Sequence, residues 1–354
     1  STGGVGDKTT LIVVPAAAAL GAKMAQMTGR GLGHTGGTTD KLEVFDGYQS
    51  EVSPARYVEL IRETGIAVVG QNDAFVPADK KLYALRDVTA TVDSLALIAS
   101  SIMSKKIAAG SHNIVLDVKT GSGAFMREYE DSLALARTMM RIGRDCGRNV
   151  RAVITDMDQP LGNAVGNSNE VIECIEILRG QRRGDVYEVS CVLAAQLLCM
   201  CFGWQQDEAL ARVRQVIANG AALEKFRQWI GSHGGDTRYI DEPERFKKPD
   251  VQQDLCAWRD GWITGMDCER VGASAVALGA GRATKGDTID PAAGLYFLKK
   301  TGDAVRKGEP IVRLGAADTQ KLDEAQQMLR AAIFIGDEKK APRPLIHCIL
   351  EQAE

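Results

Sequence analysis

Two segments near the start of the chain combine glycines with hydroxyl side chains, which is the composition of an anion-binding site. The first, residues 1–10, reads STGGVGDKTT and leads into an apolar segment with helical character. Glycines such as Gly3 let the backbone approach an anion, and free N–H groups at a helix start favour negative charge. The Gly-Lys-Ser/Thr ending of a P-loop is absent. The hydroxyls of Ser1, Thr9 and Thr10 favour a phosphate cradle over a simple tight turn.

The second segment, residues 28–41, reads TGRGLGHTGGTTDK and contains a GxGxxG pattern from Gly31 to Gly36. An acidic residue, Glu51, follows at about the spacing of a dinucleotide-binding unit. It does not end a second apolar strand, so the pattern does not predict a dinucleotide site. Two glycine- and hydroxyl-rich loops in one domain instead suit a single anion held from two sides. His34 is expected to anchor the loop.

A third group of polar residues surrounds a predicted helix over 94–109. Arg86 precedes this helix, and Ser101 and Lys105 lie four residues apart on it, so they share one face. Their hydrogen-bond donors suit the carbonyl oxygens of a flat polar ligand. The pattern alone favours simpler roles, in which Lys105 and Lys106 are a solvated pair and Arg86 pairs with a neighbouring carboxylate.

A fourth candidate is the loop MDQPLGNAVGNSN, residues 157–169, which leads into a helix that carries Glu173. Backbone carbonyls and one carboxylate are ligands that a cation accepts. Taken alone, the pattern favours an ordinary loop.

Apolar segments with the lengths of strands and helices alternate through the first two-thirds of the chain. This alternation predicts an α/β fold with a mainly parallel mixed sheet flanked by helices. The apolar stretch 189–204 is short for a membrane span and is predicted to be a buried helix. A polar connector containing Pro77 is predicted after the second strand. The predicted strands are 23–27, 67–69, 113–118 and 150–155, and the predicted helices are 11–20, 94–109, 131–146 and 168–179.

The last third of the chain has a different character. Residues 231–249 are polar and contain glycine and proline, and short glycine-rich segments alternate with turn signals after about residue 255. This pattern predicts a small β-rich domain, with a boundary near residue 250.

Composition narrows the class of protein. A formal net charge of −3 argues against a nucleic-acid-binding protein, which needs a basic surface to neutralise phosphates. The eight cysteines form no paired CxxC framework, so reduced thiols in a cytoplasmic protein are expected rather than disulfides or zinc. No signal peptide is visible. The expected partners are therefore small molecules, without nucleic acid or membrane.

Several segments together resemble the thymidine/pyrimidine-nucleoside phosphorylase family, and most of all its bacterial pyrimidine-nucleoside members. The matches occur in the family's order and cover essentially the whole chain. They are STGGVGDKTT, TGRGLGHTGGTTDKLE, RDVTATVDS, ASIMSKK, DVKTGSGAFM and GAGRATKGDTIDPAAG. The resemblance implies an α/β phosphate-binding domain over 1–77 and 109–250, a remnant of a helical pyrimidine-binding domain over 78–108, and a C-terminal α+β domain over 255–354.

The resemblance also implies roles for single residues. The family usually has serine where this chain has Thr28, and threonine where it has Lys8. A lysine side chain cannot supply a hydroxyl ligand to a cation, although its backbone carbonyl remains. The implied phosphate ligands are Ser1, Gly3, Thr10, Thr28 and Thr38, the implied catalytic and base-binding residues are Arg86, Ser101 and Lys105, and the implied potassium ligands are Gly6, Lys8, Leu161, Ala164 and Glu173.

The activity that the resemblance implies is phosphorolysis of uridine, thymidine and deoxyuridine. The products are the free base and an α-(deoxy)ribose-1-phosphate, formed with inversion at the anomeric carbon. Inorganic phosphate is the co-substrate, and no organic cofactor is implied. The family forms homodimers and carries a Lys-His pair immediately before the serine that is here Ser1, so this chain is expected to be a truncated form.

Two other functions remain open at this point. An anthranilate phosphoribosyltransferase-like enzyme would share a glycine-rich phosphate loop, but it would need magnesium and an acidic metal-binding pair that is not evident here. A non-catalytic fragment that binds phosphate or nucleoside is the other alternative, favoured by the absence of the Lys-His pair.

Overall fold

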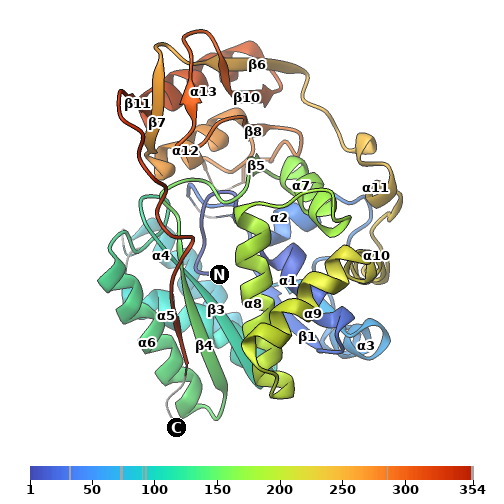
Figure 1. The fold of residues 1–354 in the computed structure, drawn as a ribbon. Coiled ribbons are helices and arrows are strands. Elements are labelled where there is room, and N and C mark those ends of the chain that lie inside the picture. Colours follow the sequence, from blue (N-terminus) through green and yellow to red (C-terminus); the bar gives the residue numbers. More distant parts are fainter. Residues whose placement is uncertain (32, 72–74, 90, 92–93, 285, 352–354) are drawn as a thin grey trace.

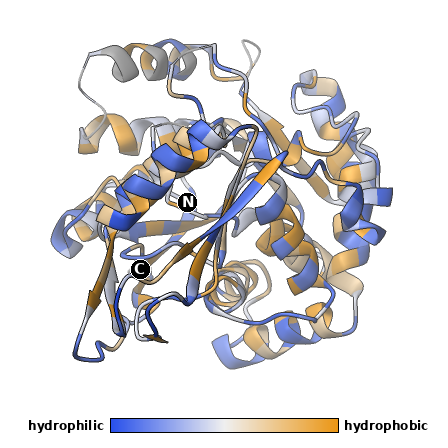
Figure 2. Ribbon diagram, turned by 90° about the horizontal axis from the view of Figure 1, so that it is seen from above, coloured by the Kyte–Doolittle hydropathy of each residue, from blue (hydrophilic) through white to orange (hydrophobic). Residues whose placement is uncertain are grey.

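The computed structural model describes residues 1–31, 33–71, 75–89, 91, 94–284 and 286–351, without the side chains of 80, 83, 84 and 86–88. A larger region of helices and short sheets contains the start of the chain, and a smaller β-rich region lies beside it (Figure 1). Hydrophobic residues gather in the strands and on the inner sides of the helices, and hydrophilic residues lie toward the outside (Figure 2).

The larger region contains most of the helices. Its elements are α1 (Thr10–Ala19), β1 (Met24–Thr28), α2 (Thr38–Leu42), α3 (Pro54–Thr64), β2 (Ile66–Gly70), α4 (Pro77–Val88), α5 (Leu95–Ala108), β3 (Asn113–Thr120), α6 (Tyr129–Asp145), β4 (Asn149–Asp156), α7 (Ser168–Leu178), α8 (Asp185–Phe202), α9 (Gln206–Ala218), α10 (Ala221–Ser232), α11 (Arg238–Asp241), a 3₁₀ turn (Pro243–Arg245) and β12 (Ile346–Leu350).

The α/β class and the parallel pairing of the predicted strands are confirmed. β1 runs parallel to β2, and β3 runs parallel to β4. The expected single sheet is wrong for the described residues, in which β1–β2 and β12–β4–β3 are separate sheets. β12 is antiparallel to β4, so the second sheet is mixed.

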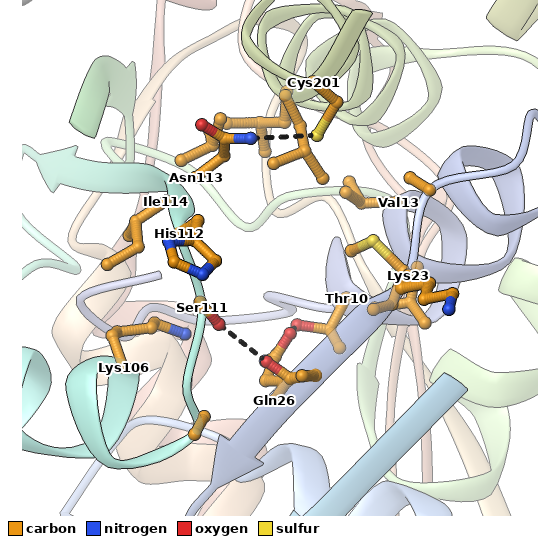
Figure 3. A pocket seen from close by; sticks show the side chains of 18 of the residues that line it. Thr10, Val13, Lys23, Gln26, Lys106, Ser111, His112, Asn113, Ile114 and Cys201 are labelled. Carbon is orange, nitrogen blue, oxygen red and sulfur yellow. Dashed lines mark hydrogen bonds between the residues drawn. The ribbon is translucent and has the colours of Figure 1, made fainter. Parts of the chain in front are cut away.

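A cavity of about 390 Å³ separates the two sheets (Figure 3). It is lined by side chains from β1, from β3 and from the start of α1, including Thr10, Gln26 and Ile114. Ser111 reaches across the gap and donates a hydrogen bond to the carbonyl of Ala25, at 3.1 Å. The edges of β1 and β3 therefore face each other without pairing.

Helices cover both faces of the β3–β4 pair, as a buried parallel pair requires. α6 packs on one face and contacts α5, whose buried residues join the same core, and α8 packs against both strands as well as against α1 and α9. By length and composition α8 could cross a membrane, but 67% of its apolar window is buried inside the protein. It is a core helix, as the sequence predicted.

α4 replaces the polar connector that was predicted around Pro77. Proline sits at the first helical position, where its missing N–H and fixed φ are tolerated. The connector prediction was wrong because the proline marks the start of a helix.

The smaller region forms two antiparallel sheets with two helices. The four-stranded sheet has the order β5-β8-β10-β6, and the three-stranded sheet has the order β11-β7-β9. Each side of the predicted boundary near residue 250 contributes one strand to a sheet of the other side. β5, which precedes the boundary, joins the four-stranded sheet, and β12, near the end of the chain, pairs with β4. The elements are β5 (Ala164–Gly166), β6 (Val251–Cys256), β7 (Gly261–Met266), α12 (Cys268–Leu278), β8 (Gly294–Phe297), β9 (Ala304–Val305), β10 (Pro310–Ala316), α13 (Thr319–Ala332) and β11 (Ile333–Gly336).

All eight cysteines are free thiols in the structure. Burial raises the pKa of Cys174 and Cys268 well above the usual value, so both stay protonated and unreactive.

The contact between α6 and β4 gives a first prediction. A Cβ atom on Gly143 would overlap the side chain of Val150, so Gly143→Ala should cost about 1–3 kcal/mol of overpacking. That cost exceeds the gain of about 1 kcal/mol in helix propensity. Denaturant unfolding should therefore show a lower midpoint. Gly231→Ala is the matched control, because Gly231 is an exposed helical glycine whose added Cβ would meet one methyl group, that of Thr237 at 3.3 Å, and its midpoint should stay close to that of the parent.

Candidate functional site

A cavity of about 820 Å³ lies between the two glycine-rich loops and α5. The structure brings the residues predicted for phosphate and base together in its lining, with the exception of Arg86. The backbone of Arg86 is part of α4, but its side chain lies outside the described residues. The predicted residues that line this cavity are Ser1, Gly3, Thr10, Thr28, Thr38, Ser101 and Lys105.

The first loop is attached to β3 through Thr2. The Thr2 N–H donates to the carbonyl of Asp117 at 2.9 Å, and the Lys119 N–H donates to the Thr2 hydroxyl at 2.9 Å. These bonds place Ser1 and Gly3 near the carboxyl end of a parallel strand. Ligand sites of open α/β sheets lie at this end.

A buried charge cluster lies beneath the first loop. Lys119 is buried with its ammonium 2.6 Å from the carboxylate of Asp117. Burial would raise the pKa of Asp7, but the charges of Lys119 and the chain's amino terminus and the hydrogen bond from Ser1 together outweigh burial and lower it well below its usual value. Asp7 is therefore ionised, and it accepts hydrogen bonds from the hydroxyls of Ser1 and Thr9. A phosphate that uses the Ser1 hydroxyl must first draw it away from Asp7.

The second loop is held by Asp40, a buried carboxylate in α2. It accepts hydrogen bonds from the Gly31 N–H at 2.7 Å, from Arg30 at 3.2 Å and from Arg282 at 3.0 Å. His34 contacts the carbonyl of Gly123 at 3.2 Å through Nε2, the anchoring role that the sequence predicted. These contacts fix the loop between Thr28, where β1 ends, and the start of α2.

Ser101 and Lys105 form one polar unit on α5, as their spacing predicted. The Lys105 ammonium donates to the Ser101 hydroxyl at 2.8 Å and to the carboxylate of Asp79 at 2.9 Å. Gln71 donates to the same carboxylate oxygen at 2.8 Å. The interpretation of Lys105 and Lys106 as a solvated pair is therefore wrong for Lys105. The sequence analysis missed Asp79, whose signal was an acid in the first turn of a helix.

Further residues missed by the sequence analysis line the same cavity. Arg282 and Thr284 come from the smaller region. They lie in the segment GAGRATKGDTIDPAAG, which resembles the family but to which the sequence analysis assigned no function. Lys106 lines both this cavity and the one between the sheets. Burial, followed by the charge of Lys105, lowers the pKa of Lys106 to about 8. The site therefore combines loops, a helix and the smaller region.

The residues predicted to hold potassium also come together, in a separate buried cluster. At its centre is the ammonium of Lys8, which donates to the carbonyls of Leu161 at 2.9 Å and Ala164 at 2.8 Å and to the carboxylate of Glu173 at 2.7 Å. Gly6 lies against the same carbonyls. The oxygens that would ligate the ion therefore bind this chain's own ammonium, so the residues present do not fit potassium. Within the described parts of the chain, no group of three or more His, Cys, Asp or Glu could hold a metal ion.

The electrostatics of this cluster keep both partners charged. Burial alone would lower the pKa of Lys8, but the charges of Glu173 and Glu170 outweigh burial and raise it. Burial alone would raise the pKa of Glu173, but the charge of Lys8 and the hydrogen bonds that Glu173 accepts together outweigh burial and lower it. The ion pair thus stabilises the fold between the unfolded-state pKa values of a glutamate and a lysine, and its contribution falls outside that range.

The family matches and the sequence relatives agree on one family. Residues 1–223 match the family described as "Glycosyl transferase family, a/b domain", and residues 262–336 match "Pyrimidine nucleoside phosphorylase C-terminal domain". The chain is 49% identical to a pyrimidine-nucleoside phosphorylase of Staphylococcus aureus (strain USA300) and 48% identical to one of Bacillus subtilis (strain 168). Each alignment covers 99% of this chain and 81% of the relative. Among solved structures, anthranilate phosphoribosyltransferase from Thermus thermophilus has a TM-score of 0.47 and 17% identity, covering 65% of this chain and 74% of that one.

The second loop gives a test of the candidate phosphate site. A Cβ on Gly37 would overlap the backbone of Arg30 and Gly31, whereas a Cβ on Gly29 meets nothing within 4 Å. Gly37→Ala must therefore shift the loop, and titration calorimetry should show at least about a tenfold loss in phosphate affinity, or about 1.4 kcal/mol. Gly29→Ala should bind phosphate more tightly than Gly37→Ala. Equal phosphate affinity in the two variants would show that this loop does not contribute to phosphate binding.

Proposed function

The chain belongs to the pyrimidine-nucleoside phosphorylase family, and from that premise we propose that it catalyses the phosphorolysis of pyrimidine nucleosides. One observation carries the proposal: a single cavity is lined both by the two glycine- and hydroxyl-rich loops and by Ser101 and Lys105. A phosphate and a flat polar base can thus be held side by side. The proposed substrates are uridine, thymidine and deoxyuridine.

Phosphate binds between the two loops in this proposal. Ser1 and Thr10 face it from the first loop, and Thr28 and Thr38 face it from the second, while Gly3 lets the backbone approach. The N-terminal end of α1 adds favourable electrostatics for an anion. Two loops that grip one anion fix the direction in which its oxygen points, which supplies the orientation that a bimolecular step needs.

The reaction is a direct displacement at the anomeric carbon of the sugar. A phosphate oxygen attacks this carbon from the face opposite the base and forms a new carbon–oxygen bond. The carbon–nitrogen bond to the base breaks, and its electron pair leaves with the pyrimidine. The sugar phosphate therefore has the inverted, α configuration. Phosphate attacks directly, so the proposal includes no organic cofactor and no covalent enzyme intermediate.

Arg86, Ser101 and Lys105 are proposed to stabilise the negative charge that grows on the departing base. Donors aimed at developing charge in a site that excludes water are worth about 3–4 kcal/mol each at the upper end. Asp79 is proposed as a positioning residue, because its carboxylate holds the Lys105 ammonium at 2.9 Å. The role of Arg86 rests on the family resemblance. A cytoplasmic homodimer is also proposed on that basis.

An assay for phosphorolysis tests the proposal directly. Uridine, thymidine and cytidine are incubated with phosphate, and release of free base is followed. The assay is run on this chain and on a form preceded by the Lys-His-containing segment that the resemblance implies. Phosphate-dependent release of base in either form supports the proposal. Folded protein that releases no base in both forms would point to the transferase or to a binding module.

Lys105 offers a sharper test within an active form. Lys105→Ala should lower kcat/KM for nucleoside by about 10²-fold or more, because the departing base loses a charged donor. Lys81→Ala is the matched control, since Lys81 is an exposed lysine on α4, and its kcat/KM should stay near that of the parent. If Lys105→Ala retained activity within a factor of a few of the parent, the assigned role would be wrong.

A further inference from the structure

The Lys8 side chain occupies a position that is built for a cation. It is 1% exposed, and its three nearest polar partners are oxygen atoms from a loop and from a helix that follow it by more than 150 residues. An ammonium group has three hydrogen-bond donors. All three are used, on Leu161, Ala164 and Glu173, so the group is fully satisfied without water.

A free monovalent cation has no room in this arrangement. It would need the same carbonyl and carboxylate oxygens, and it would lie within contact distance of the ammonium. Two like charges at such a separation in a buried site repel strongly. The carbonyl and carboxylate oxygens that surround the Lys8 ammonium can therefore hold one cation, and the chain supplies that cation itself.

We propose that the Lys8 ammonium takes the structural place of the potassium ion, so that this protein keeps its phosphate-binding loop ordered without a bound monovalent cation. The cation is covalently tethered to the loop that it orders. It cannot be diluted or exchanged, whereas the stabilising effect of a bound ion depends on its concentration. The structural role of Lys8 does not depend on the proposed function. Only the predicted effect on the KM for phosphate rests on it.

The contacts around Lys8 explain why the phosphate loop depends on this charge. Lys8 stands at the end of the first loop, directly before α1, and its bonds tie that loop to residues 161–164. Gly6 packs on the same carbonyls, where a Cβ would lie 2.6 Å from the Leu161 oxygen. Lys300 donates to two further carbonyls of the same turn, those of Pro160 at 2.8 Å and Gly162 at 3.1 Å. Two lysine ammonium groups thus hold this turn.

Glu173 makes the positive charge necessary. Its carboxylate is 2% exposed and also accepts hydrogen bonds from the N–H groups of Asn163 and Ala164, at 2.9 and 3.0 Å. Arg182 lies 3.2 Å from its other oxygen. Without the Lys8 ammonium, Glu173 would keep Arg182, whose side chain is 22% exposed, as its charged partner, and the carbonyl oxygens of Leu161 and Ala164 would lose their donor. Removing one partner of a buried ion pair is strongly destabilising. A variant that lacks the Lys8 ammonium should therefore recruit a cation from solution if its side chain leaves space.

The test measures thermal unfolding in potassium chloride and in choline chloride at equal ionic strength. The parent protein should have the same Tm in both salts. Lys8→Thr shortens the side chain and supplies a hydroxyl, so it should unfold at a lower Tm in choline chloride. Potassium chloride should then raise its Tm in a saturable way, by about 2–4 °C. This measurement needs no enzymatic activity, so its outcome is independent of the phosphorolysis assay.

Two further variants distinguish potassium binding at this site from a nonspecific rise in the Tm of a destabilised protein. Lys8→Met removes the charge but keeps the bulk, so its Tm should fall in both salts and potassium should not restore it. Lys41→Thr is the matched control. Lys41 is also buried and lies 3.3 Å from a glutamate, Glu170, but its ammonium has no hydrogen bond to a carbonyl oxygen of the described residues. Its Tm should fall without recovery in potassium.

Two results would overturn the proposal. The first is a saturable rise in the Tm of the parent protein with potassium, which requires only the parent to be folded. The second is a potassium response of Lys8→Thr no larger than that of Lys41→Thr. As a second readout in an active form, the KM for phosphate should depend on potassium in Lys8→Thr and not in the parent.

Discussion

Three buried lysines, each facing a carboxylate, determine how the two phosphate-binding loops are held. A charged ammonium group cannot be removed from water unless it is paired, and breaking such a pair costs about 3–5 kcal/mol. Lys8 at the end of the first loop reaches Glu173, and Lys41 in α2 reaches Glu170. Both glutamates lie on α7, three residues apart, so one helix serves as the platform for both loops. Lys119 pairs with Asp117 on β3, beneath the first loop.

This arrangement explains why the large cavity needs distant parts of the chain. α7 follows the turn at residues 160–166, where Lys8 binds the carbonyls of residues 161 and 164 and Lys300 binds those of residues 160 and 162. Lys300 also contacts Asp185 at the start of α8. Arg282, from the same smaller region, binds Asp40 in the second loop. Ion pairs and hydrogen bonds thus connect the smaller region to the loops. In addition, β5 pairs with β8 of the smaller region, and β12 pairs with β4 of the larger region. The smaller region also completes the wall of the site.

The residues proposed to bind the base are held differently from the phosphate loops. Lys105 is part of a polar unit with Ser101 and Asp79 rather than a tightly buried ion pair, because its side chain is 14% exposed toward the cavity. Such a group can exchange a protein partner for a ligand at modest cost. The phosphate loops are therefore held by the buried pairs beneath them, while the base-binding residues stay available to a substrate.

The local features could be predicted from the amino-acid sequence. Apolar runs such as 113–118 and 150–155 predicted β3 and β4 because burial of a parallel strand on both faces leaves a continuous hydrophobic pattern. Glycine and hydroxyl content predicted the two loops, and the four-residue spacing of Ser101 and Lys105 predicted that they meet. The three-dimensional fold was needed to show that β1 and β3 face a cavity instead of pairing, that Asp79 holds Lys105, and that Lys8 fills the place expected for an ion. Each of these depends on a partner far away in the chain, and periodicity and spacing within a segment carry no information about which distant group a side chain will reach.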